Sequence, residues 1–304
     1  MGSARGSVTA WFLACLPLSL QDAGAVPELA PLGVVEFEPE AWSERRVGTV
    51  HIDRTRRIWV CDERSGRLHV YDEQGKPLFA VMPEPAGEFG RFTPAWFADG
   101  AGGQLFVGTN RHLVELDASG RQLVRRRLPA QGRRHLPTAD GRFEIGDERV
   151  WFRTEKQAAR EVALCAEGAT FHPAATEALG GLVVCEQDLG SDPGSHAPQV
   201  LRFGANGELV SRASLAQQCW ILDLLVQGDR VLLLVDTAGR ECALGQARAE
   251  LWRLNSGGEI VQRSRLPEEL ERPRQVLAAA TVGEVLVLGA REPRLYRFAL
   301  PAAR

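Results

Sequence analysis

The sequence predicts an all-β protein, a six-bladed β-propeller with four-stranded antiparallel blades, and three observations carry this prediction. Short apolar runs of strand length recur along the chain, glycine-containing turns recur between them, and helical periodicity is nearly absent. A repeat of roughly 40–50 residues that carries four strands is the signature of a propeller blade. Six such units fill the chain after its first 25 residues.

The repeat is clearest from its turns. In the first unit the runs IWV and LHVY start at Ile58 and Leu68, and the second run ends in the turn YDEQGK around Gly75. A glycine there suits the positive φ of a tight hairpin. Equivalent turns are LDASGR, LCAEGA, FGANGE and LNSGGE, centred on Gly120, Gly168, Gly207 and Gly258. The apolar runs ahead of these turns are LFV at Leu105, VWF at Val150, LVV at Leu182 and VLLLV at Val231, and a sixth run, VLVLG, starts at Val285.

The two ends of the chain predict how the ring closes. The last unit ends at FALPAAR without room for an outer strand, and the N-terminal run GVVEFE, from Gly33 to Glu38, has no blade of its own. We expect this run to supply the outermost strand of the sixth blade, which also removes an exposed sheet edge. A separately packed N-terminus is the alternative, which the strong β-propensity of the run disfavours. The innermost strands are expected near VGTVHID, PAWFADG, TADGRFEI, ATEALGG, CWILDLLVQG and VLAAATVG.

These units resemble the repeats of a known family. The segment from Gly87 to Gly120 contains a G-x-F lead-in at Gly90 and Phe92, then Pro94, and ends in a D-x-x-G turn at Asp117. It resembles the repeat of six-bladed propellers of the NHL-repeat-like or TolB-like type. The resemblance implies the fold but no single activity, because such propellers include lyases, lactonases and pure binding proteins.

The first 25 residues predict export. MGSAR supplies a positive charge, VTAWFLACLPLSL is an apolar run, and Ala23-Gly24-Ala25 fits a signal-peptidase site. The apolar run is too short to span a bilayer comfortably. We therefore expect a signal peptide at residues 1–25, a single propeller domain at residues 26–304, and a periplasmic or extracellular protein. Lipoprotein processing at Cys15 is the less favoured alternative.

Net charge limits the classes of partner, and the number of cysteines limits the possible disulfides. With 36 basic and 39 acidic residues the net charge is −3, which does not point to nucleic acid or to an anionic membrane. Five cysteines would remain after cleavage, so at least one thiol stays unpaired. The favoured disulfide joins Cys219 and Cys242, with Cys165–Cys185 as the second choice. Alternatively, Cys61 and Cys185 are simply small buried side chains, or the unpaired thiol serves a redox sensor.

Propeller ligands usually bind at the central channel, so candidate residues are those on or near the predicted innermost strands. Three histidines fall there, but at unequal distances ahead of the following strand, so we expect them at different depths and predict no metal site. Tryptophans at a channel mouth could stack on a ligand, although packing between blades is their commoner role. The candidate binding residues are His51, Asp53, Trp96, Asp99, His172, Trp220 and Asp223. Convergence of three or more of the set His51, Asp53, Asp99, His135, His172, Glu177 and Asp223 would indicate a metal centre.

Resemblance to gluconolactonase-like propellers would require a channel Asn, but Asn206 and Asn255 fall in predicted turns and Asn110 between strands. Resemblance to amidating lyases would require a channel Tyr, whereas Tyr71 and Tyr296 fall within other strands. We therefore predict no catalytic residues and no cofactor, with calcium or zinc in the channel as the alternative.

One basic segment, RRRLPAQGRRH, connects the second and third units. It could dock an acidic partner, although charge runs are more often solvated loops. Its arginines are Arg125, Arg126, Arg127, Arg133 and Arg134. Taken together, the sequence predicts an exported monomer that acts as a non-catalytic binding or scaffold module for a protein, peptide or glycan. The alternative is an exported hydrolase or lyase with a divalent cation in the channel.

Overall fold

The fold was analysed in a computed structural model of the whole chain. The structure describes residues 26–37, 47–62, 67–83, 96–99, 103–109, 112–127, 134–138, 140–176, 180–188, 197–215, 219–227, 230–237, 249–268, 270, 273, 275–278, 283–289 and 294–301. Within them no helix is long and apolar enough to cross a membrane. The predicted signal peptide lies outside these residues, so export remains a prediction.

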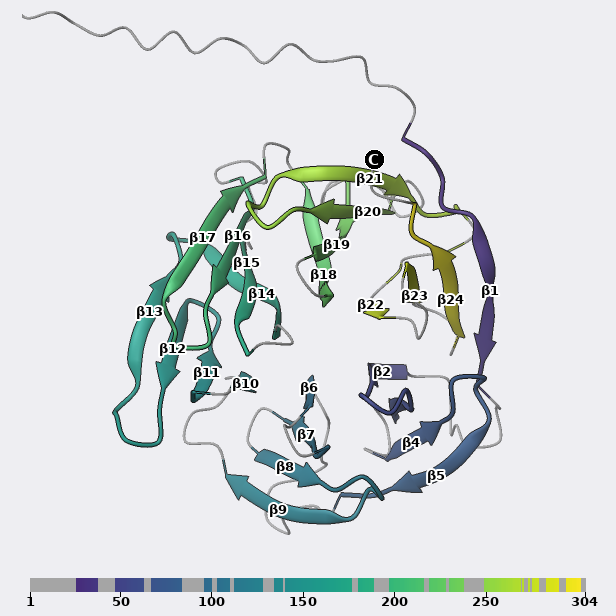
Figure 1. The fold of residues 1–304 in the computed structure, drawn as a ribbon, viewed down its shortest axis with the longest axis horizontal. Helices are drawn as coiled ribbons and strands as arrows, with labels where there is room; N and C mark the ends of the chain where they lie inside the picture. Colours follow the sequence, from purple (N-terminus) through teal and green to yellow (C-terminus); the bar gives the residue numbers. More distant parts are fainter. Residues whose placement is uncertain are drawn as a thin grey trace, which may run out of the picture.

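The described strands form six four-stranded antiparallel sheets that follow one another around a ring (Figure 1). Blade 1 contains β2 (Val47–Ile52), β3 (Ile58–Asp62), β4 (Leu68–Tyr71) and β5 (Pro77–Val81). Blade 2 contains β6 (Trp96–Asp99), β7 (Leu105–Gly108), β8 (His112–Leu116) and β9 (Gln122–Arg127). Blade 3 contains β10 (Arg134–Pro137), β11 (Arg142–Ile145), β12 (Arg149–Arg153) and β13 (Arg160–Leu164).

The second half of the ring has the same order, from the innermost strand outwards. Blade 4 contains β14 (Ala169–Thr176), β15 (Leu182–Asp188), β16 (Gln199–Phe203) and β17 (Leu209–Ser214). Blade 5 contains β18 (Trp220–Gln227), β19 (Arg230–Asp236), β20 (Ala249–Leu254) and β21 (Ile260–Arg265). Blade 6 contains β22 (Gln275–Ala278), β23 (Glu284–Leu288), β24 (Arg294–Ala299) and, outermost, β1 (Pro31–Glu36). The predicted six-bladed propeller is confirmed.

Ring closure by the N-terminal strand is also confirmed. β1 pairs antiparallel with β24, with Val34 opposite Tyr296. Just before β1 the chain crosses to the neighbouring blade, where the Arg265 amide donates to the Pro27 carbonyl at 2.8 Å and the Leu29 amide donates to the Arg265 carbonyl at 2.9 Å. Leu29 is buried in the hydrophobic cluster shared by blades 5 and 6. The N-terminal segment therefore bonds to both blade 5 and blade 6 and joins them.

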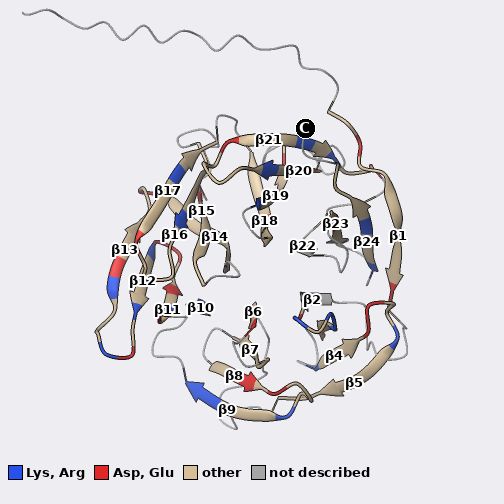
Figure 2. Ribbon diagram, in the orientation of Figure 1, with Lys and Arg blue, Asp and Glu red and all other residues tan. Residues whose placement is uncertain are grey.

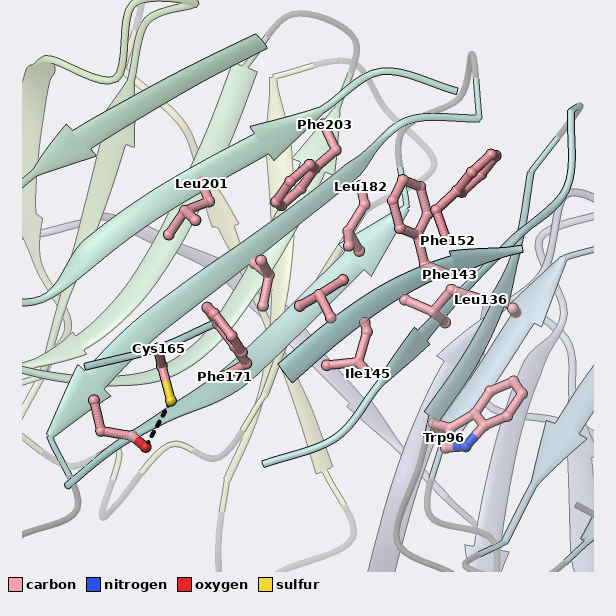
Figure 3. Packing of buried hydrophobic residues seen from close by; sticks show 14 residues of the cluster. Trp96, Leu136, Phe143, Ile145, Phe152, Cys165, Phe171, Leu182, Leu201 and Phe203 are labelled. Atoms are coloured by element: carbon pink, nitrogen blue, oxygen red, sulfur yellow. Dashed lines mark hydrogen bonds between the residues drawn. The ribbon is translucent and has the colours of Figure 1, made fainter. Parts of the chain in front are cut away.

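The hydrophobic core lies between blades rather than inside them, because a single sheet cannot bury both of its faces. One cluster joins blades 2, 3 and 4 through Trp96, Phe143, Phe171 and Phe203 (Figure 3). Trp96, a predicted binding residue, lies in this cluster with 5% of its surface exposed. Trp96 therefore packs between blades, which is the commoner role of a propeller tryptophan.

The repeated glycine turns are also contacts between blades. Gly120, in the turn between β8 and β9, has a φ of 82°. A Cβ at this position would lie 2.5 Å from Val81 Cγ2, on the outer strand of blade 1. At Gly258, in blade 5, it would lie 2.2 Å from Ala213 Cβ of blade 4. The turn residue must therefore be glycine both for its backbone angle and for the close approach of the preceding blade.

Blade 3 departs from the predicted frame. Gly168 does not lie between the third and fourth strands of a blade but in the turn that leads from β13 into β14. The segment TADGRFEI contributes the second strand, β11, and the innermost strand is Arg134–Pro137. Residues 155–158, in the connection between β12 and β13, are exposed. This blade was misassigned because its outer turn lacks the glycine that marks the others.

Candidate functional site at the ring axis

Hydrogen bonds link five of the six pairs of neighbouring blades at or next to their innermost strands, and we call this set of contacts the inner belt. Between blades 1 and 2, His51 Nε2 lies 3.0 Å from Asp99 Oδ1. Between blades 1 and 6, the Val50 amide donates to Gln275 Oε1 at 3.1 Å, and Gln275 Nε2 donates to the Val50 carbonyl at 2.7 Å. Between blades 5 and 6, the Val276 amide donates to Asp223 Oδ2 at 2.9 Å.

The inner belt continues through blades 5, 4 and 3. Gln187 Nε2 donates to the carbonyls of Ile221 at 2.9 Å and His172 at 2.8 Å, and Gln187 Oε1 accepts from the Ile221 amide at 2.9 Å. The Phe171 amide donates to the Asp147 carbonyl at 2.7 Å. Successive contacts use residues no more than two positions apart on each innermost strand. His51 takes part in the inner belt through its side chain and His172 through its backbone carbonyl.

Gln187 and Gln275 were missed in the sequence, although a signal was present for Gln187. Gln187 is 2% exposed and follows the apolar run LVVC within β15. A polar side chain inside a buried run must find hydrogen-bond partners, because leaving it unpaired is costly. Each glutamine satisfies both the amide and the carbonyl of one residue in the next blade, which fixes the position of neighbouring innermost strands.

Asp223 is the most perturbed acid on the belt. Burial raises the pKa of its carboxyl to about 7, against the opposing effects of hydrogen bonds from the Val276 and Leu224 amides and of the Arg134 charge. Asp223 follows a bulge in β18, between Ile221 and Asp223. Bulges redirect side chains and are frequent beside functional sites. At neutral pH this carboxyl can therefore hold or release a proton.

Arg134 and His172 complete a group with Asp223, on the innermost strands of three consecutive blades. Burial lowers the pKa of the Arg134 guanidinium, while Asp223 and Asp147 act in the opposite direction. Burial, together with the Arg134 charge, lowers the pKa of His172 to about 4. His172 is therefore neutral at physiological pH, and it lies within the bulge of β14 between Phe171 and Ala174. The structure thus brings together two predicted site residues, His172 and Asp223, with Arg134 of the predicted basic segment.

His51 and Asp99 form a second polar contact on the belt. Their side chains are 20% and 24% exposed. The His51 ring also stacks on Phe97, with centroids 5.6 Å apart and planes 13° apart. The structure therefore brings these two predicted residues together as a pair.

His135 is separated from this group. It is opposite Glu144 in the pairing of β10 and β11, and both are buried. Glu144 Oε1 also lies 3.1 Å from Arg142 Nη2 and 3.0 Å from Arg153 Nε. Burial raises the pKa of Glu144, but the charges of His135 and the two arginines outweigh it and leave the pKa lowered. This ionic cluster lies within blade 3.

Asp53 is a turn residue rather than a free carboxylate. Its Oδ1 accepts from the Thr55 amide at 2.8 Å and from the Thr55 hydroxyl at 2.6 Å, and its Oδ2 accepts from Trp59 Nε1 at 2.8 Å. Arg57 Nη2 lies 2.7 Å from the same Oδ2. Burial raises its pKa, but the hydrogen bonds from Thr55, Trp59 and Arg57 lower it overall. Its lone pairs are thus used within blade 1.

Trp220, another predicted binding residue, begins β18 and is partly buried.

The predicted basic segment is divided between two places. Arg125, Arg126 and Arg127 end the outer strand β9, where Figure 2 shows basic colour, and the last two are exposed. Arg134 instead starts the innermost strand of blade 3. Arg133 lies outside the described residues. The segment therefore presents no single described basic surface.

The described cysteines are all free thiols, so the second-choice pair, Cys165–Cys185, is not formed. Cys242 lies outside the described residues, and the favoured pairing with Cys219 stays a prediction. Burial raises the pKa of Cys219 to about 12 and raises that of Cys165 and Cys185. Cys165 also donates to the Ala169 carbonyl at 3.1 Å (Figure 3). These thiols therefore lack the thiolate character that a redox sensor requires.

The residues for the metal-dependent alternative do not come together in the described part of the chain, where no three His, Cys, Asp or Glu side chains are grouped as metal ligands. Glu177 and Asn110 lie outside it. As predicted, Asn206 and Asn255 serve their own turns: Asn206 Oδ1 accepts from the Glu208 amide and Asn255 Oδ1 from the Glu259 amide. Tyr71 and Tyr296 lie on β4 and β24, away from the innermost strands.

Comparisons with known proteins define the class but not the activity. No protein-family model matches the chain, and no characterised protein matches it in sequence. The fold is shared with a streptogramin B lyase structure, with a TM-score of 0.57 and 14% identity over 91% of this chain and 95% of that one. For a gluconolactonase from Xanthomonas campestris the TM-score is 0.56 and the sequence identity 14%, over 92% of this chain and 96% of that one. For the Pan2 WD40 domain of Neurospora crassa the TM-score is 0.57 and the sequence identity 11%, over 90% of this chain and 96% of that one.

The chain is therefore a six-bladed β-propeller that resembles the streptogramin B lyase and gluconolactonase propellers. At these identities the likeness concerns the fold alone, because one propeller fold carries unrelated functions.

Proposed function

We propose that this chain is an exported, non-catalytic binding module that holds a protein, peptide or glycan partner at the inner belt. The observation that supports it is that the charge of Arg134 acts on both His172 and Asp223, and these three residues lie on the innermost strands of three consecutive blades. Such convergence from separate elements is how a rigid scaffold presents a binding site. The other ionisable residues placed there by sequence, His51 and Asp99, already bond each other.

Binding without turnover is the testable core of this proposal. Purified protein would be screened on peptide and glycan arrays, and each hit would be titrated by calorimetry. We expect saturable binding with one ligand per chain, and mass spectrometry should recover the ligand unchanged after overnight incubation. A control with Arg126→Gln, on the outer strand of blade 2, should bind equally well. Conversion of a ligand to a product would overturn the proposal in favour of a hydrolase or lyase.

Export is the second part of the proposal. The N-terminal segment begins its hydrogen bonds to β21 at Pro27, so cleavage after Ala25 would leave that contact intact. N-terminal sequencing of protein produced with its full N-terminus in a bacterial host should give Val26 as the first residue. A protein that keeps residues 1–25, or that starts at a lipid-modified Cys15, would contradict this.

A further inference from the structure

His51 and Asp99 are held side by side on the inside of the ring. They lie on β2 and β6, the innermost strands of blades 1 and 2, which are neighbours there (Figure 1). His51 Nε2 lies 3.0 Å from Asp99 Oδ1, and the His51 ring stacks on Phe97, two residues before Asp99 on the same strand. Gln275 bonds both the amide and the carbonyl of Val50, the residue before His51. The pair is therefore positioned in advance of any ligand.

The bond between the two side chains determines which of their atoms can bind something else. An ionised carboxylate only accepts hydrogen bonds, so His51 donates from Nε2, and in the neutral ring Nδ1 is then an acceptor. Asp99 Oδ2 is an acceptor as well. Within the described part of the chain neither Nδ1 nor Oδ2 has a hydrogen-bond partner, and the two side chains are 20% and 24% exposed. The pair therefore offers a ligand two acceptors.

The charge beside these two acceptors is negative. Neutral His51 together with ionised Asp99 carries one negative charge. Asp53, the next acid along the chain from His51, adds no net charge, because Arg57 Nη2 lies 2.7 Å from its Oδ2. An anion would be repelled here. A group with one positive charge and several donors matches both the charge and the acceptors.

We propose that His51 and Asp99 bind a primary ammonium group of a peptide or protein ligand. This inference rests on the proposed function and names the group by which the partner is held. One N–H of the ammonium donates to Asp99 Oδ2 and another to His51 Nδ1, and the carboxylate balances its charge. A lysine side chain or a chain N-terminus carries this group.

An ammonium fits this pair better than a guanidinium does. A guanidinium forms its strongest pair with both oxygens of one carboxylate in one plane. Asp99 Oδ1 already accepts from His51, and the second open acceptor, Nδ1, belongs to a side chain of the other blade. Three donors on one compact nitrogen can reach acceptors that are not coplanar. Sugar hydroxyls are neutral and would leave the charge of Asp99 unbalanced, which favours a peptide over a neutral glycan.

The experiment uses the intact protein and three small probes followed by ¹⁹F NMR, at low salt and about pH 8, where a free imidazole is neutral and a primary amine is charged. The probes are 4-fluorobenzylamine, its neutral isostere 4-fluorobenzyl alcohol, and 4-fluorobenzylguanidine. We expect the amine to bind about tenfold more tightly than the alcohol, because a charge-assisted hydrogen bond is replaced by a neutral one. Added salt should weaken binding of the amine, since the pair is partly exposed. Equal binding of the amine and the alcohol, or tighter binding of the guanidine, would overturn the ammonium site.

Two variants locate the bound amine. Asp99→Asn keeps an oxygen for His51 Nε2 but removes the charge, so binding of the amine should weaken about tenfold. His51→Phe keeps a ring that can stack on Phe97 but removes Nδ1, and it should weaken binding about threefold or more. Asp140→Asn, which removes an exposed carboxyl of blade 3, is the control for net charge and should leave binding unchanged. Melting temperatures show whether the variants are folded, and wild-type affinity in folded Asp99→Asn or folded His51→Phe would overturn the site.

Competition identifies the source of the ammonium group. Nα-acetyl-lysinamide represents a lysine side chain, and glycinamide represents a chain N-terminus. Displacement of 4-fluorobenzylamine by either one supports a peptide ligand. Displacement by glucosamine alone would overturn this assignment in favour of an amino sugar.

The array ligand separates this inference from the proposed function. If the wild type binds an array ligand but not 4-fluorobenzylamine, the ammonium inference fails and the binding module stands. If the amine binds but no array ligand does, the ammonium site stands and the proposed function is overturned. If Asp99→Asn loses the amine but keeps the array ligand at full affinity, the site stands, and its proposed link to partner binding is overturned.

Discussion

Two kinds of side-chain junction contribute to the inner belt, and they differ in the hydrogen-bonding groups that they leave available to a ligand. At the junctions between blades 4 and 5 and between blades 6 and 1, a glutamine amide bonds both the amide and the carbonyl of one residue in the next blade. At the junctions between blades 1 and 2 and between blades 5 and 6, the contact is made by ionisable side chains, the His51–Asp99 pair and Asp223.

The two kinds of junction differ in whether their side chains can change charge. A glutamine amide matches a peptide group without any charge, so a glutamine junction holds at every pH and offers little to a ligand. A carboxyl keeps a proton equilibrium that a glutamine amide lacks. If the proposed function holds, we expect ligand contacts at the ionisable junctions and structural support at the neutral ones.

The largest expected effect is at a neutral junction. Gln187→Leu keeps the approximate volume but leaves the amide and carbonyl of Ile221 and the carbonyl of His172 without this partner, so we expect a loss of about 3 kcal/mol or more in the free energy of unfolding. Urea denaturation measures it. Gln74→Leu, at an exposed turn, is the matched control and should cost little. A loss below about 1 kcal/mol for Gln187→Leu would break the comparison.

The next effect is a change in pH dependence at the ionisable group. Asp223 holds its proton to about pH 7 when folded but loses it near its ordinary 3.8 when unfolded, so its contribution to stability falls as pH rises through 7. His172 is protonated below about 4 when folded and below 6.5 when unfolded, so its contribution rises over pH 4 to 6.5. The two contributions oppose each other in that range.

Removing either side chain should therefore leave the pH dependence of stability that the other side chain contributes. Relative to the wild type, the stability of Asp223→Asn should rise from pH 4 to 7, and that of His172→Gln should fall from pH 4 to 6.5, each by up to about 1.4 kcal/mol per pH unit. Urea denaturation at several pH values gives these slopes. Asp140→Asn, which alters an exposed carboxyl, is the control. Parallel slopes for both variants and the wild type would show that neither group titrates as described.

The smallest effect is expected at the His51–Asp99 pair. Asp99→Asn removes the charge but keeps an oxygen that can accept from His51 Nε2. Because both side chains are partly exposed, we expect a loss of about 0.5 kcal/mol, which added salt should reduce. Unfolding at low and high ionic strength checks both points. A loss above 2 kcal/mol would mean that this junction supports the ring as strongly as a glutamine junction does.

The parts of the fold that repeat were predictable, and the parts that join the repeats were not. The strand runs and the glycine turns follow local rules that each blade obeys, which is why the ring and its closure by GVVEFE could be predicted. Blade 3 was misread because Gly168 imitates the turn in a different place. The contact between Gln275 and Val50 joins distant segments of the chain, so no local pattern announces it.

The candidate site shows the same division. His172 and Asp223 were identified because they lie close to the predicted innermost strands. Arg134 was placed in a basic loop because neighbouring arginines hid the start of β10. Asp53 was a candidate binding residue because of its position near an innermost strand, and its hydrogen bonds with Thr55 and Trp59 depend on a turn conformation that the residue types alone do not specify.

Ring closure by β1 also has a consequence for the order in which the protein is made. The strand at residues 31–36 is synthesised before any of the blades, yet its sheet partner among the described strands is β24, at residues 294–299. The sixth blade therefore cannot be finished, and the ring cannot close, until the ribosome has added these later residues.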